Sequence, residues 1–168
     1  MKQDNFVLIG FMGCGKTSVG VRLSYLLKCT FADTDKMIED REGKSISEIF
    51  ATEGEAAFRD KETQLLSELN KGFQGSILSV GGGTPLREEN RKLLRQLGTV
   101  IYLRIRPETV YKRLQGDTTR PLLQCDDPLE RITKLLEQRK DVYEDAADII
   151  VDVDGLDMEE VISAIMQS

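Results

Sequence analysis

Short apolar runs alternate with longer amphipathic stretches along the chain. Apolar runs of three or four residues, bounded by glycine or polar residues, are typical of strands that are buried on both faces of a parallel sheet. We expect five such strands, at residues 6–9, 30–32, 77–80, 100–103 and 149–151.

The segments between these runs carry apolar residues at helical spacing. In the first of them Val19, Leu23, Leu26 and Leu27 recur with the period of a helix. Pro107 indicates the start of another helix, because proline is favoured in a first helical turn. We therefore expect helices at residues 15–28, 45–71, 88–97, 128–143 and 158–166, and one that begins at Pro107.

The helical segment 45–71 contains signals for its own start and for a break. Ser45 and Glu48 have the spacing of a capping box, in which each residue bonds the backbone N–H of the other. Gly54 predicts a break, so we expect this segment to form two helices.

Residues 115–127 show no sustained period. They are polar and include Gly116 and Pro121, which predicts a mobile loop. Elsewhere strands and helices alternate, and this alternation predicts a single α/β domain over residues 1–168. The pattern alone does not give the order of the strands in the sheet.

Composition narrows the range of partners. The 168 residues are 40% hydrophobic and carry a net charge of −6, which disfavours binding to nucleic acid. The basic segment 87–95 is interrupted by Glu88 and Glu89 and is typical of a solvated helix face. No long apolar stripe is left over for an obligate interface, so we expect a monomer.

Cysteine and histidine content restricts the compartment and the metal chemistry. Cys14, Cys29 and Cys125 are widely spaced, and the chain has no histidine. This disfavours both a zinc site and a disulfide framework. No apolar stretch approaches the roughly 20 residues that span a bilayer. We therefore expect a cytoplasmic protein without a membrane partner.

The clearest chemical signal is the segment GFMGCGKT at residues 10–17, which fits the phosphate-binding pattern G-x-x-x-x-G-K-S/T between a strand and a helix. Glycines let backbone N–H groups turn toward phosphate oxygens, and the helix N-terminus favours the same anion. Lys16 can reach the β- and γ-phosphates, and the Thr17 hydroxyl can bind Mg²⁺. We expect the nucleotide to contact Gly13, Cys14, Gly15, Lys16, Thr17 and Ser18.

Cys14 has two interpretations. It can be a small residue of which only the backbone matters, or a thiol whose pKa is lowered by the nearby helix N-terminus. The second is a hypothesis of oxidation sensitivity.

Other polar residues, which could bind a second substrate that accepts a phosphate, follow the later strands. Asp33 and Asp35 come directly after the segment 30–32, where the ends of parallel strands usually bind ligands. One carboxylate can hold Mg²⁺ through water while the other orients or deprotonates a hydroxyl. The alternative is that they cap and solvate a helix that begins near Lys36.

Three arginines and a glycine triplet are weaker signals. Arg59, Arg120 and Arg139 suit bidentate binding of a carboxylate or phosphate, although each alone is more often a surface charge. Glycines at 81–83 form either a turn or a place where a substrate approaches the backbone.

Taken in order, these segments resemble one family. The sequence GFMGCGKT, then DTD, FR, GGG, RPLL and finally R-x-x-x-Y closely resembles shikimate kinase, from residue 6 to about residue 155. The resemblance implies a three-layer P-loop kinase fold, with a five-stranded parallel sheet in the order 2-3-1-4-5 flanked by helices. It also implies substrate-binding helices at about 34–62 and a lid at about 115–127.

The resemblance assigns roles to the polar residues. Asp33 matches a magnesium-associated aspartate, and Asp35 the aspartate that contacts the accepting hydroxyl. Arg59 and Arg139 match the arginines that bind the shikimate carboxylate, and Glu62 an acid that fixes Arg59. The remaining matches are Arg120 on the lid near the transferring phosphate, Arg113 stacked on adenine, Gly81, Gly82 and Gly83 lining the pocket, and Phe50 and Phe58 as its apolar wall.

The resemblance therefore implies transfer of the γ-phosphate of ATP to the 3-hydroxyl of shikimate, with Mg²⁺. Lys16, Arg120 and Asp35 would be the catalytic residues. Two features differ from other members. The loop continues as Thr17-Ser18 where many members have Ser-Thr or Thr-Thr, and residues 153–159 lack a proline that contacts adenine in some members. A gluconate or nucleotide kinase and a non-catalytic ATP-dependent switch are the alternatives.

Overall fold

The computed structural model describes residues 5–117 and 123–168, so Arg120 lies outside the described residues. Five strands form one sheet in the order β2-β3-β1-β4-β5, and every neighbouring pair is parallel. This order confirms the fold class expected from the resemblance. The strands are β1 (Phe6–Ile9), β2 (Thr30–Asp33), β3 (Ser76–Ser79), β4 (Thr99–Arg104) and β5 (Ile149–Asp152).

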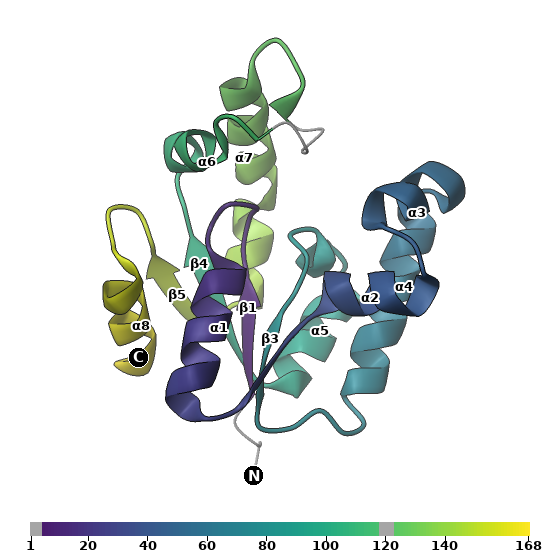
Figure 1. Ribbon diagram of the computed structural model, residues 1–168, viewed down its shortest axis with the longest axis vertical. Coiled ribbons are helices and arrows are strands. Elements are labelled where there is room, and N and C mark those ends of the chain that lie inside the picture. The colour runs from purple at the N-terminus through teal and green to yellow at the C-terminus, as the bar shows by residue number, and fades with distance from the viewer. Residues whose placement is uncertain (1–4, 118–122) are drawn as a thin grey trace.

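Helices cover both faces of the sheet (Figure 1). The helices α1 (Lys16–Leu27) and α8 (Met158–Met166) contact each other on one face. On the other face lie α5 (Glu88–Leu97) and α7 (Pro128–Ala146), which also contact each other. Right-handed crossovers require this arrangement, because the chain runs from β1 toward one edge and then back across the sheet.

The remaining helices stand beside the sheet. In Figure 1, α2 (Thr34–Glu42), α3 (Ile46–Glu53) and α4 (Glu55–Leu69) group together on one side, and α6 (Pro107–Leu114) lies next to α7. A short 3₁₀ turn, η1 (Thr84–Leu86), follows the glycine triplet. The hydrophobic pattern predicted neither this turn nor α2, whereas the resemblance implied helices at about 34–62.

Local signals account for the start of several helices. Ser45 accepts a hydrogen bond from the Glu48 N–H at 3.1 Å, which is one of the two bonds of the predicted capping box. Gly54 separates α3 from α4, as predicted. Asp33 caps α2 by accepting hydrogen bonds from the N–H groups of Asp35 and Lys36. Within the described residues, no helix is long and apolar enough to cross a membrane.

The core has two parts. The large one packs the helices against the buried strands, including Leu8, Leu78 and Ile101, which are fully buried. A smaller cluster joins α2, α3 and α4 through Ile38, Ile49, Phe58 and Leu65.

Gly98 marks a close approach between α5 and the segment before β1. A Cβ at this position would overlap the backbone oxygen of Asn5, which accepts a hydrogen bond from the Thr99 N–H at 2.9 Å. We expect Gly98→Ala to lower the free energy of unfolding by about 1–3 kcal/mol, because backbone must shift to admit the methyl group. Urea unfolding measures this loss.

Gly72→Ala is the matched control for this substitution. Its Cβ would meet no heavy atom within 4 Å, and Gly72 has no positive φ angle. A loss at Gly98 no larger than that at Gly72 would contradict the expected overlap.

Candidate active site

The loop after β1 has the backbone expected of a phosphate cradle. Gly13 and Gly15 have φ angles of 80° and 98°, in the left-handed region that favours glycine. The Lys16 ammonium lies back over the loop and donates to the Gly10 carbonyl at 2.7 Å. The residue at the N-terminal cap of α1 is Gly15, which has no side chain. The first N–H groups of α1 therefore have no side-chain cap. This arrangement suits the binding of phosphate oxygens.

The loop is tied to its surroundings on two sides. Arg113 from α6 donates to the Gly13 carbonyl at 2.9 Å, which places this expected adenine neighbour against the loop. The Cys14 side chain is only 2% exposed, and its sulfur lies 3.8 Å from Lys16 Nζ. Burial restricts reagents from reaching this thiol, and the hypothesis of its oxidation sensitivity stays a prediction.

Asp33 and Asp35 lie where β2 becomes α2, at the carboxyl edge of the sheet. Asp33 Oδ1 accepts from the Asp35 N–H at 2.9 Å, so the capping interpretation is right for this residue. Asp35 differs, because its Oδ1 is buried and has no hydrogen-bond partner among the described residues. A buried carboxylate oxygen without a partner is costly and is well placed to bind a ligand hydroxyl.

The surroundings of Asp35 raise its pKa from the usual 3.8 to about 6. Burial is the main cause, and the nearby carboxylates of Asp33 and Glu62 add to it, while Lys16 opposes the shift. A pKa in this range suits a group that is ionised at neutral pH and can accept a proton.

Arg59 and Glu62 form the floor of the acceptor side. Arg59 donates to Glu62 at 2.7 Å and lies over the Phe58 ring at 5.4 Å. Glu62 is only 1% exposed and also accepts from the Thr84 hydroxyl. The predicted role of Glu62 as the partner that orients Arg59 therefore agrees with this contact, although its role toward a substrate stays a prediction.

Arg139 approaches from α7. Its guanidinium lies 5.7 Å from the centre of the Phe11 ring. Tyr143, one turn later on α7, donates to the Gly82 carbonyl at 2.6 Å. Desolvation raises the pKa of the Tyr143 hydroxyl to about 12, so it remains a hydrogen-bond donor at neutral pH.

The glycine triplet connects these groups. A Cβ at Gly81 would lie 2.8 Å from Asp35 Oδ1, and one at Gly82 would lie 3.5 Å from an Arg139 nitrogen. One at Gly83 would overlap the guanidinium of Arg59. The backbone at 81–83 thus brings together the carboxylate and the two arginines that the sequence predicted.

Apolar side chains border this cluster. The rings of Phe50 and Phe58 lie 5.0 Å apart, and Phe58 is buried in the smaller core cluster. Phe50 is half-buried, which fits its expected place in the apolar wall of a pocket.

Three supporting residues were missed by the sequence reasoning. Phe11 packs on Arg139, Thr34 accepts from the Gly81 N–H at 3.3 Å, and Thr84 holds Glu62. Thr34 and Thr84 lie directly inside or after the DTD and GGG segments, so proximity to those motifs was the only available signal.

The residues that are expected to hold Mg²⁺ have suitable chemistry. Thr17 is exposed at the start of α1, and Asp33 supplies carboxylate oxygens at the end of β2. Within residues 5–117 and 123–168, no group of three acidic or cysteine side chains is close enough to hold a metal alone. Mg²⁺ is commonly bound by one or two side chains with substrate phosphates and waters, so this sparse set fits it.

Comparisons with known proteins agree on one family. A family model described as shikimate kinase matches residues 12–168. A shikimate kinase of Thiobacillus denitrificans is 46% identical over 151 residues, covering 90% of this chain and 82% of that protein. A shikimate kinase of Thermodesulfovibrio yellowstonii is 43% identical and covers 98% of this chain and 94% of that protein.

Solved structures give the same result. A shikimate kinase from Acinetobacter baumannii in complex with shikimate has a TM-score of 0.90 at 36% identity, covering 98% of this chain and 92% of that one. A gluconokinase from Sinorhizobium meliloti has a TM-score of 0.56 at 16% identity, covering 99% of this chain and 91% of that one. The second likeness shows a shared fold alone.

Proposed function

The chain belongs to the shikimate kinase family, and on this premise we propose that it transfers the γ-phosphate of ATP to the 3-hydroxyl of shikimate. The products are ADP and 3-phosphoshikimate, an intermediate on the route to chorismate and the aromatic amino acids. Both substrates are small molecules.

The observation that carries the acceptor assignment is the buried Oδ1 of Asp35, which has no hydrogen-bond partner in the described part of the chain. It lies beside Gly81, in the cluster that also contains Arg59 and Arg139. A ring that carries a carboxylate and hydroxyls would place the carboxylate on the arginines and one hydroxyl on Asp35. We assign binding of the shikimate carboxylate to Arg59 and Arg139, with Glu62 orienting Arg59.

The chemistry needs positioning and neutralisation more than a strong base. The shikimate oxygen attacks the γ-phosphorus, the bond to the ADP oxygen breaks, and the hydroxyl proton passes to Asp35. Lys16 and the backbone N–H groups of residues 13–18 hold the phosphates. We assign Mg²⁺ to Thr17 and Asp33, where it would neutralise charge on the phosphate oxygens.

The lid assignment completes the proposal. Arg120 and most of the RPLL segment lie outside the described residues, so the role of Arg120 at the transferring phosphate stays a prediction from the resemblance. Closure of residues 115–127 would exclude water and suppress hydrolysis of ATP. We propose further that the 168 residues act as one monomeric cytoplasmic domain, with no nucleic-acid or membrane partner.

An assay of ADP release with different acceptors tests the function. We expect ADP to appear with ATP, Mg²⁺ and shikimate, and little ADP with gluconate, a nucleoside monophosphate or no acceptor. Release with gluconate would identify the rival kinase. Binding of ATP without any acceptor-dependent release would instead support a switch and overturn the proposal.

A further inference from the structure

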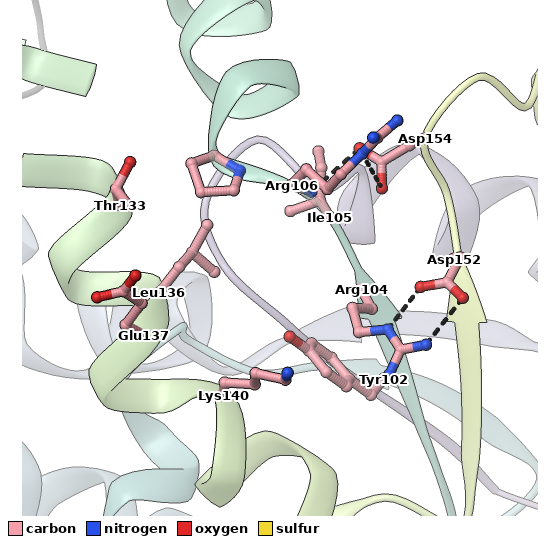
Figure 2. Close-up of a pocket in the computed structure, with 11 residues that line it drawn as sticks. Tyr102, Arg104, Ile105, Arg106, Thr133, Leu136, Glu137, Lys140, Asp152 and Asp154 are labelled. Atoms are coloured by element: carbon pink, nitrogen blue, oxygen red, sulfur yellow. Dashed lines mark hydrogen bonds and ion pairs between the residues drawn. The ribbon is translucent and has the colours of Figure 1, made fainter. Parts of the chain in front are cut away.

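One cavity lies away from the residues that we assign to ATP and shikimate. It has a volume of about 300 Å³ and lies between α7 and the ends of β4 and β5. Figure 2 shows Leu136 and Lys140 of α7 on one side and Tyr102 and Arg104 of β4 on the other. None of the residues assigned above to ATP, Mg²⁺ or shikimate lines it.

The floor of this cavity contains the hydroxyl of Tyr102. Tyr102 is 2% exposed, and its hydroxyl has no hydrogen bond to any other described residue. Figure 2 shows this hydroxyl pointing into the space in front of α7. Because the hydroxyl opens into the cavity while the rest of the residue is buried, a water or a ligand in the cavity can complete its hydrogen bond.

Among the described residues that line the cavity, Lys140 is the one cation without an ion pair. Arg104 binds Asp152 through two hydrogen bonds of 2.5 and 2.8 Å. Asp154 accepts from the Arg106 N–H at 3.0 Å and lies 3.8 Å from its guanidinium. Lys140 has no hydrogen bond or ion pair with the described residues, and its ammonium points toward Tyr102 in Figure 2.

The rest of the lining is mostly apolar. Thr133 also lines the cavity, and its hydroxyl donates to the Leu129 carbonyl at 2.7 Å. Ile105, Pro107 and Leu136 line the cavity, and Ile105 and Leu136 are buried. Figure 2 shows the Glu137 carboxylate turned away from Tyr102. An apolar body would therefore pack on these walls while one negative charge meets Lys140.

We propose that this cavity binds a small monocarboxylate with an apolar body, whose carboxylate pairs with Lys140 and accepts a hydrogen bond from Tyr102. Lys140, the one lining cation within the described part of the chain that has no ion pair, suits a ligand with one negative charge. A phosphate group, with up to two charges, would face the carboxylates of Asp152 and Asp154 without a second partner. The size is at the lower end of ligand cavities, which fits one ring with a short substituent.

The site also borders the acceptor pocket through α7. Lys140 follows Arg139 directly in the sequence, and the Tyr102 ring packs on Tyr143 with centres 5.0 Å apart. A ligand in the cavity would therefore contact the same helix that supplies the arginine assigned to shikimate.

The test is a titration of the protein with benzoate, followed by amide NMR shifts. Saturating shikimate and ADP are present throughout, so that the acceptor pocket is filled. We expect saturable shifts confined to residues 102–107, 133–140 and 152–154. Benzylamine and benzyl alcohol, which lack the negative charge, should bind more weakly by about fivefold or more.

Substitutions identify the two contacts. Lys140→Ala should weaken benzoate by about fivefold or more, and Tyr102→Phe by about threefold, because one removes the charge and the other only a hydroxyl. Lys134→Ala, on the exposed part of the same helix, should leave affinity unchanged. Equal binding by benzylamine, unchanged affinity in Lys140→Ala, or shifts limited to residues 81–83 would each overturn the proposal. The readout is binding, so its failure is separate from any failure of the kinase assay.

Discussion

Asp35→Asn is expected to lower kcat for shikimate phosphorylation by about 10²–10⁴-fold, while KM for ATP changes by less than about threefold. Asparagine retains the size of the side chain but cannot take the hydroxyl proton. The phosphate-binding loop is untouched, so nucleotide binding should persist. Steady-state kinetics with each substrate varied in turn separates these effects. An equal loss of ATP affinity would contradict the assignment of Asp35 to the acceptor.

The same substitution is expected to stabilise the fold at neutral pH. Burial raises the pKa of Asp35 to about 6 in the folded protein, against 3.8 for the ordinary side chain. The ionised carboxylate therefore costs stability, and this cost grows as the pH rises from about 4 to about 6 and then stays constant. Asp35→Asn should raise the free energy of unfolding by about 1–3 kcal/mol at pH 8 and by little near pH 4.

Two comparisons check this account of Asp35. In the unsubstituted enzyme kcat/KM should rise with pH through about 6, because the ionised carboxylate is the reactive form. Asp40→Asn is the control, since Asp40 lies on the same helix but is exposed and pairs with Lys36 at 2.9 Å. Loss of activity in Asp40→Asn as large as in Asp35→Asn would indicate a general effect on α2.

Arg139→Ala is expected to raise KM for shikimate by about 100-fold, with a smaller decrease in kcat and little change in KM for ATP. A charged hydrogen-bonded pair contributes about 1.5–3 kcal/mol, which corresponds to about ten- to hundredfold in affinity. Arg139 has no ion pair with an acid among the described residues, whereas Arg59 is already bound by Glu62. The charge of Arg139 is therefore the more available one for a substrate carboxylate.

A graded series tests whether geometry or charge alone matters at this position. Arg139→Lys keeps the charge but loses the planar fork, so it should fall between the parent and Arg139→Ala. Arg131→Ala, an exposed position on the same helix, should leave KM for shikimate unchanged. Equal kinetics for the lysine and alanine variants would indicate that only the bidentate geometry contributes.

Sequence predicted the local elements well and their arrangement less completely. The strands at 6–9 and 77–80 and the break at Gly54 were readable because apolar runs and glycine act over a few residues. The order of strands was not readable from that pattern, since each crossover can run toward either edge of a sheet. It came from the resemblance, and the hydrogen-bonded pairs confirm it.

The candidate site shows the same division. Asp35, Arg59 and the glycines were found because their motifs are compact. Thr84 was missed because its importance depends on Glu62, which lies 22 positions earlier and meets it only after folding. Tyr102 was taken only as part of an apolar strand, because no sequence pattern shows that its hydroxyl faces a cavity.

The separate small cluster of Ile38, Ile49, Phe58 and Leu65 has an evolutionary consequence. Helix α4, which carries Arg59 and Glu62, is joined to α2 and α3 by this cluster, and Leu69 packs against both the cluster and the main core. Substitutions in this unit can reshape the acceptor pocket while the sheet and the phosphate loop keep their packing. A protein divided in this way can change the substrate that it phosphorylates through substitutions in the small helical unit, while the sheet and the phosphate loop stay as they are.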